Sequence, residues 1–267
     1  MSEHTKATAG APISSLHSSA SLVTNMNSFD GPASAPSSAP NEVWAMTHLA
    51  SHLRLWIITF AGLAADLWTK DWAFHRLKPG ESLVLVKNLC SLQVSLNPGA
   101  LFGIGAGLAP IFVGASVLAL MFVLYLFAHS TARRWSMHVA LGFVLAGAIG
   151  NLYDRTTQSG YVLHFNTGSR VIGTLVNESA QAVTLGDFPN GERSQTYPRL
   201  SISSAGYEPV VRDFIKIEAR LGHFSLWPWI FNIADALLVV GVGLLLLNFW
   251  SDRHGHASPG EPVGPAA

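Results

Sequence analysis

The stretch FNIADALLVVGVGLLLL, residues 231–247, decides the fold class because a single aspartate, Asp235, lies in an otherwise apolar run. About 20 mostly apolar residues are enough to cross a bilayer as a helix. A carboxylate near the bilayer centre costs roughly 2.5 to 3.5 kcal/mol, so an acid in such a segment is expected to have a function. A second acid, Asp213, lies upstream in VVRDFI. If the two side chains meet, they form an aspartic dyad.

The composition places the chain among membrane proteins. Of the 267 residues, 49% are hydrophobic and 12% are charged, whereas soluble domains carry about 25% charged residues. The formal net charge is zero, which gives no indication of a nucleic-acid partner. The single cysteine, Cys90, cannot form an internal disulfide, and no group of cysteines and histidines has the spacing of metal ligands. We therefore expect no metal and no cofactor.

Four windows are long and apolar enough to span a membrane as helices. Most of the tryptophans lie within or beside these windows, as is typical of residues at membrane interfaces. Four helices place both chain ends on the same side of the membrane, but the basic residues of the loops do not decide which side. The four windows are about residues 53–74, 110–128, 135–153 and 229–250.

The segments outside the windows differ in character. Residues 1–45 are rich in Ser, Ala, Pro and Asn and lack hydrophobic periodicity, so we expect a disordered tail, and we expect another at residues 256–267. No secretory signal pattern follows Met1, so the first span is expected to stay as an uncleaved anchor. The membrane domain is then residues 46–255.

Two long loops carry strand-like patterns. Residues 75–109 alternate before the turn signal Asn97-Pro98-Gly99, in which Gly99 has a structural role. Residues 156–212 also alternate and are broken by hairpin turn signals such as PNGE. The sequence therefore predicts a small β-rich cap over one membrane face, with residues 156–212 as an insert.

Polar residues inside the spans are candidates for structural or binding roles. Asp66 and Lys70 are four apart with the acid first, so we expect a structural ion pair. At the end of the third window, Asn151 and Arg155 share a helix face and either bind a substrate or cap the helix. Asp154, between them, is expected to be structural.

The two acids predict a hydrolytic chemistry. Asn232 and Asp235 are three apart and are expected to share one face of the fourth helix. With the helix starting near Trp229, Asp235 lies roughly 9 Å into the span, and Asp213 is expected in an amphipathic stretch on the membrane surface. In a low dielectric the acids share one proton, so one activates water while the other donates to a carbonyl oxygen. The alternative is that each acid only pairs with a base, namely Arg155, Arg212 or Lys216.

Five short motifs, taken in order, resemble the bacterial lipoprotein signal peptidases, over about residues 53–250. The resemblance implies a four-helix inner-membrane aspartic endopeptidase with a periplasmic β-cradle and both termini in the cytoplasm. Such enzymes remove the signal peptide from diacylglyceryl-modified prolipoproteins and cut immediately before the lipidated cysteine. The motifs are DLWTK at 66–70, NPGALFG at 97–103, GNLYDR at 150–155, VVRDFI at 210–215 and FNIAD at 231–235.

The resemblance also implies roles for individual residues. Asp213 and Asp235 look like the catalytic pair of a site near the periplasmic face. The implied partners are the prolipoprotein and membrane lipid, and we expect a monomer. The residues that look like substrate-positioning groups are Asn97, Asn151, Arg155 and Asn232.

The chain departs from the family pattern in two places. Residues 156–212 separate two motifs that are usually joined by a few residues, which makes Asp187 in TLGDF a rival for the first catalytic acid. We prefer Asp213, because its distance to FNIAD and the intervening HFSLWPWI fit the family pattern. In addition, Leu101 stands where an alanine is usual, beside the expected cleft.

Two other classes of function remain to be weighed: a small proton-linked membrane transporter, in which intramembrane acids relay ions, and a non-catalytic membrane scaffold. Against the transporter stand the small number of spans and the concentration of the acids near one interface.

Overall fold

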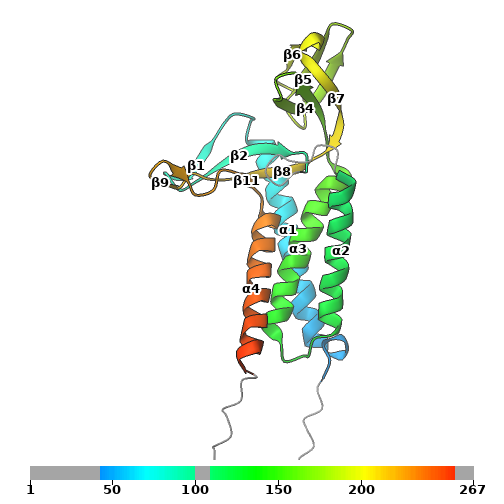
Figure 1. Cartoon of the computed structure of the whole chain (residues 1–267), viewed down its shortest axis with the longest axis vertical. Helices are drawn as coiled ribbons and strands as arrows, with labels where there is room; N and C mark the ends of the chain where they lie inside the picture. The colour runs from blue at the N-terminus through cyan, green and yellow to red at the C-terminus, as the bar shows by residue number, and fades with distance from the viewer. Residues whose placement is uncertain (1–42, 100–108, 256–267) are drawn as a thin grey trace, which may run out of the picture. The chain divides into compact units, whose positions relative to one another are not determined.

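The computed structural model describes residues 43–99 and 109–255. This part of the chain holds four α-helices. They lie side by side, with strands at one end of them (Figure 1). α1 starts and α4 ends at the opposite end. The helices are α1 (Leu49–Arg76), α2 (Ala109–Ala128), α3 (Trp135–Thr157) and α4 (Ile233–Gly255).

The helices occupy the four predicted windows. Within the part of the chain that the structure describes, two helices are long and apolar enough to cross a membrane, Trp135–Thr157 and Ile233–Arg253, and Val113–Ala128 is a shorter apolar helix. Four membrane spans therefore stay a prediction. The surfaces of α2 and α4 are rich in exposed large apolar side chains, which suits helices that face lipid.

α3 is the central helix and packs against the other three. Glycines on α3 make this close packing possible. A Cβ on Gly142 would lie 2.9 Å from Ile58 of α1, and a Cβ on Gly147 would collide with the backbone oxygen of Ala234 on α4. Small residues let the helix backbones approach in this way.

The first sheet, here called the cradle sheet, holds strands from distant parts of the sequence. Its order is β1-β2-β8-β11, and the neighbouring strands are antiparallel. In its register, Ser95 of β2 lies opposite Asp213 of β8, and Asn97 lies opposite Val211. A small hairpin of β9 (Arg220–Leu221) and β10 (Phe224–Ser225) follows β8. The strands of the cradle sheet are β1 (Leu83–Val86), β2 (Cys90–Asn97), β8 (Val211–Ile217) and β11 (Ile230–Phe231).

The second sheet is made entirely by residues 159–209, here called the insert. Its order is β6-β5-β4-β3-β7, and Leu163 and Val183 are fully buried in its own apolar core. Because α3 continues to Thr157 and β8 begins at Val211, the insert is slightly shorter than the predicted 156–212. Its strands are β3 (Ser159–Phe165), β4 (Arg170–Glu178), β5 (Ala182–Gly186), β6 (Gln195–Pro198) and β7 (Ile202–Pro209).

The insert enters and leaves the molecule at neighbouring points. Ser159 of β3 pairs with Pro209 of β7, and the backbone N–H of Val210 donates to the oxygen of Gln158 at 3.1 Å. The chain thus returns to where it left α3 before it enters β8. The insertion lengthens the sequence without separating α3 from β8.

Two predicted boundaries differ from the structure. The predicted tail, residues 1–45, ends too late: Ala45 is buried, and its N–H donates to the oxygen of Ser130 at 2.9 Å, which anchors a short 3₁₀ turn Ala45–Thr47. The fourth helix begins at Ile233 rather than near Trp229, because Ile230 and Phe231 pair with β8. The rest of the N-terminal tail, the C-terminal tail and Leu101 lie outside the described residues.

Candidate active site

Asp213 lies on β8 and is only 3% exposed. The expectation of an amphipathic surface stretch here was wrong, because residues 211–217 pair with β2 as a strand. Both carboxylate oxygens accept hydrogen bonds from amides. Asn97 Nδ2 donates to Oδ2 at 3.1 Å, and Asn232 Nδ2 donates to Oδ1 at 2.7 Å. Two distant segments therefore hold this carboxyl group in one orientation.

Asp235 lies in the first turn of α4, so the predicted depth of roughly 9 Å was wrong. Asn232 precedes the helix instead of sharing its face. It accepts a hydrogen bond from the Asp235 N–H at 3.0 Å, and its own N–H donates to Asp235 Oδ2 at 3.2 Å. This reciprocal pair is the arrangement of a capping box, which fixes both side chains at the helix start.

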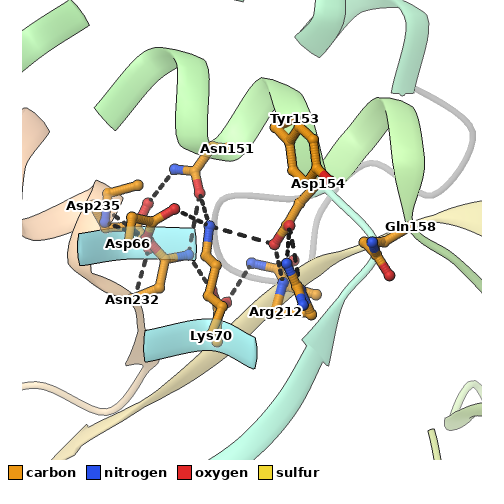
Figure 2. Close-up of polar contacts among 12 residues, drawn as sticks. Asp66, Lys70, Asn151, Tyr153, Asp154, Gln158, Arg212, Asn232 and Asp235 are labelled. Atoms are coloured by element: carbon orange, nitrogen blue, oxygen red, sulfur yellow. Dashed lines mark hydrogen bonds and ion pairs between the residues drawn. The ribbon is translucent and has the colours of Figure 1, made fainter. Parts of the chain in front are cut away.

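Asn151 of α3 joins the same cluster (Figure 2). Its Nδ2 donates to Asp235 Oδ1 at 2.7 Å, and its Oδ1 accepts from Asn232 Nδ2 at 3.1 Å and from Lys70 Nζ at 3.3 Å. The amide of Asn232 thus contacts both Asn151 and Asp213. The structure brings the two candidate acids together through this shared amide.

The electrostatics of the cluster differ between the two acids. Burial, followed by the negative charge of Asp235, raises the pKa of Asp213 to about 8, and the hydrogen bonds from Asn97 and Asn232 oppose the shift. Asp235 is only half-buried. Because the raised pKa favours the neutral form, Asp213 carries its proton at neutral pH.

A buried charge network lies next to the acids. Lys70 Nζ is 2.8 Å from Asp66 Oδ2, the expected ion pair, and 3.3 Å from Asp154 Oδ2. Asp66 Oδ1 accepts from the N–H of Ala234 at 2.8 Å. Asp154 also binds Arg212 through the backbone N–H at 2.9 Å and through the guanidinium at 2.9 Å. The network connects α1, α3, α4 and β8 around the site.

The three basic residues that could pair with the acids have different partners. Arg212 pairs with Asp154, and Lys216 donates to Gln93 at 3.0 Å. Arg155, one helical turn beyond Asn151, is near enough to attract Asp235 and Asp213 electrostatically. The bond between Asp154 and Arg212 was not foreseen, because it joins residues that the insert separates in sequence.

Two further candidates have clear places. Gly99 has a φ of 102°, a conformation that favours glycine, and its N–H donates to Asn97 Oδ1 at 3.2 Å, which orients the Asn97 amide toward Asp213. Asp187 lies in the turn after β5, where its carboxylate is 3.5 Å from Arg193 Nε. The rival acid therefore makes its ion pair within the insert.

Comparisons of the sequence with known proteins agree on one family. The sequence model described as "Signal peptidase (SPase) II" matches residues 58–251. A lipoprotein signal peptidase of Rhodopirellula baltica is 30% identical over 87% of this chain and 89% of its own length. One of Desulfitobacterium hafniense is 27% identical over 72% of this chain and 90% of its own. A solved bacterial membrane enzyme is similar in fold, with a TM-score of 0.52 at 20% identity over 82% of this chain and 98% of its own.

Proposed function

The chain belongs to the signal peptidase II family, and from that premise we propose that it is an aspartic endopeptidase with Asp213 and Asp235 as its catalytic pair. It is a membrane protease that cleaves signal peptides from lipoproteins. Its substrate is a diacylglyceryl-modified prolipoprotein, and the cut falls immediately before the lipidated cysteine. Family membership does not favour the transporter or the scaffold.

One observation carries the catalytic assignment. Asn232 donates its side-chain N–H to Asp213 and exchanges two hydrogen bonds with Asp235. A residue that only needed to cap α4 would use the bonds to Asp235 alone. The additional bond to a buried acid on another element supports a preorganised pair of carboxyl groups.

The different environments of the acids give each one a role. Asp235, half-buried in the first turn of α4, acts as the base that takes a proton from a water molecule, and the resulting hydroxide attacks the scissile carbonyl carbon. Asp213, protonated at neutral pH, donates its proton to the carbonyl oxygen. When the tetrahedral intermediate collapses, Asp235 gives its proton to the leaving nitrogen and Asp213 recovers a proton from the hydroxyl group. Both acids return to their starting states.

The asparagines act as positioning residues for this chemistry. Asn97 and Asn232 hold the two oxygens of Asp213, and Asn151 holds one oxygen of Asp235. Arg155 adds a positive charge beside both acids, which suits the binding of a substrate carbonyl or a lipid head group. Fixed donors of this kind need no reorganisation when charge develops in the transition state.

The location of the site suits a substrate anchored by lipid. Both acids lie where helix α4 meets the cradle sheet, at the strand-bearing end of the helices. The acyl chains of the substrate stay in the bilayer while its peptide crosses the acids, so membrane anchoring supplies proximity. We place the enzyme in the bacterial inner membrane with this end toward the periplasm. One chain supplies both acids and all three asparagines, which supports a monomeric enzyme.

Cleavage of a diacylglyceryl-modified lipobox peptide tests the assignment. Asp213→Asn and Asp235→Asn should each lower kcat by about 100-fold or more, the range expected for loss of a general acid or base. Asp187→Asn is the matched control and should keep near wild-type activity. Loss of activity in the Asp187 variant together with full activity in the Asp213 variant would overturn the choice of the first acid.

A further inference from the structure

A groove of about 450 Å³ lies between the insert and the cradle sheet. Here it is called the insert groove. Its wall on the cradle side is Val94, Ser95 and Leu96 of β2, and its wall on the insert side includes Arg170–Ile172 of β4 and Tyr197 of β6. The groove therefore exists only because this chain carries the insert.

The groove follows the edge of a strand. Side chains of successive residues in a strand point to opposite faces of a sheet, yet three successive residues of β2 line this groove. The strand must therefore present its edge. β1 pairs with β2 only from Cys90 to Leu92, so among the described residues the stretch 93–97 has a strand on its β8 side alone. Such an edge can accept an extended peptide as an additional strand.

The same edge leads to the candidate catalytic acids. Ser95 lies directly opposite Asp213 in the sheet, and Asn97, two residues further along β2, donates to the Asp213 carboxylate. A peptide paired with this part of β2 would therefore run toward the scissile position. The signal peptide itself is the membrane-spanning part of the substrate, whereas the groove is built from strands outside the helices. The fitting occupant is thus the substrate segment on the mature side of the cut.

The charged residues of the groove indicate which side chains it prefers in a bound peptide. Arg193 is compensated by Asp187 at 3.5 Å and by Glu81 at 3.4 Å. Arg170 is half-buried at the groove wall, and its guanidinium has no hydrogen-bond or ion-pair partner within residues 43–99 and 109–255. A partly desolvated guanidinium suits a carboxylate, which it can bind through two parallel hydrogen bonds.

We propose that the insert groove binds the mature-side segment of the prolipoprotein as an extended strand along β2, with Arg170 pairing with an acidic side chain of that segment. The inference rests on the proposed peptidase function and adds a determinant of substrate preference to it. The insert is then the second wall of an extended substrate site.

The test uses full-length enzyme and three lipid-modified lipobox peptides. One ends directly after the lipidated cysteine, one continues with a mature segment containing aspartates, and one has lysines at the same positions. Arg170→Ala should raise KM for the aspartate peptide by about three- to tenfold, the size expected of one partly screened ion pair, and should leave kcat and the short peptide unchanged. Arg170→Glu should prefer the lysine peptide.

Controls separate this inference from the function on which it rests. Arg220→Ala removes an exposed arginine outside the groove and should not change the preference. N-methylation of alternate amides in the aspartate peptide should lower kcat/KM at the positions that face β2 and leave the positions between them unaffected. Equal effects of Arg170→Ala on all three peptides, or no effect on any, would refute the groove as a binding site while wild-type cleavage of the short peptide still supported the peptidase.

Discussion

Asn232 shows how one residue can set the geometry of two acids. Its backbone N–H and side-chain oxygen are used by Asp235, and its side-chain N–H groups by Asp213 and Asn151. Spacing in the sequence indicated that Asn232 and Asp235 are neighbours. It could not indicate that Asp213 joins them, since that contact depends on the pairing of β8 with β2 and β11.

Other contacts between residues also differ in whether local spacing in the sequence predicts them. The pair of Asp66 and Lys70 follows from the helix period, because residues four apart lie on one face. The contact between Asn97 and Asp213 joins positions 116 apart, and no local period encodes such a distance. The motifs identified both residues as candidates for the site. Their contact could be known only from the register of β2 against β8.

The raised pKa of Asp213 predicts the alkaline side of the pH profile. The acid must be protonated to donate, so kcat/KM should fall as the pH rises through about 8. Initial rates with a lipidated peptide between pH 5 and pH 10, at roughly half-unit steps, measure this limb. A kcat/KM that does not fall between about pH 7 and pH 10 would contradict the assignment.

The same shift predicts a change in stability. The folded protein holds the Asp213 proton more tightly than the unfolded chain does, so the free energy of unfolding contributed by this group falls as the pH rises from 3.8 to about 8.

Lys70 is expected to be the most sensitive position of the buried charge network. Lys70→Met leaves Asp66 without its cationic partner and removes one of the two cations beside Asp154 in a fully buried site. Loss of one partner of a buried pair typically costs about 3 to 5 kcal/mol. Thermal unfolding in detergent should show a large fall in Tm.

Two further variants serve as controls for the measurement of Tm. Lys216→Met removes a half-buried lysine that makes one hydrogen bond to Gln93, and it should cost much less. The double variant Asp66→Asn with Lys70→Met should recover part of the loss, because Asp154 keeps Arg212. A Lys70→Met protein as stable as the Lys216→Met protein would contradict the role of the network.

At the scale of elements, the sequence predicted the four helices but not which strands belong to which sheet. Apolar windows identify helices because each is a continuous local signal. The alternation in residues 75–109 and 156–212 predicted strands, yet it could not assign β8 to the sheet of β2 and the neighbouring β7 to the insert. Helix α4 starts late for a related reason: Ile230 and Phe231 are apolar enough for a span but pair with β8.

Removal of the insert should leave the catalytic machinery intact. A variant in which residues 159–209 are replaced by Asn-Gly, a favoured two-residue hairpin turn, should cut the short lipopeptide at nearly the wild-type rate. The reason is that Gln158 and Val210 already lie side by side. The variant should be somewhat less stable, since Phe188 of the insert packs edge-on against Phe74.

The measurement pairs kcat/KM for the short peptide with Tm. The same excision combined with Asp213→Asn is the control for background cleavage. A folded excision variant without activity on the short peptide would show that the insert belongs to the catalytic site.

For the whole molecule, orientation in the membrane is the property that the sequence left open. Arg133 and Arg134 lie in the short loop between α2 and α3, while Lys78, Lys87 and Arg170 lie in the strand-bearing segments at the other end. Positive residues on both sides make the count indecisive. The periplasmic location of the strands therefore stays part of the proposed function, and membership in the family supports it.

Reporter fusions test this orientation. A reporter that is active only in the periplasm should work when it is placed in the turn between β4 and β5, and should fail after residue 255. A reporter active only in the cytoplasm should give the opposite result, because α1 starts and α4 ends at the same end of the helices. Opposite locations for the start of α1 and the end of α4 would mean an odd number of spans.

The adjacency of Ser159 and Pro209 makes this junction a natural splice point. Domains are inserted or exchanged most readily where the two ends of a segment lie close together. A fluorescent protein or an affinity handle grafted between Gln158 and Val210 would travel with the enzyme while the bond from Asn232 to Asp213 stayed in place. Related chains could exchange inserted domains at this position during evolution and keep the same catalytic site.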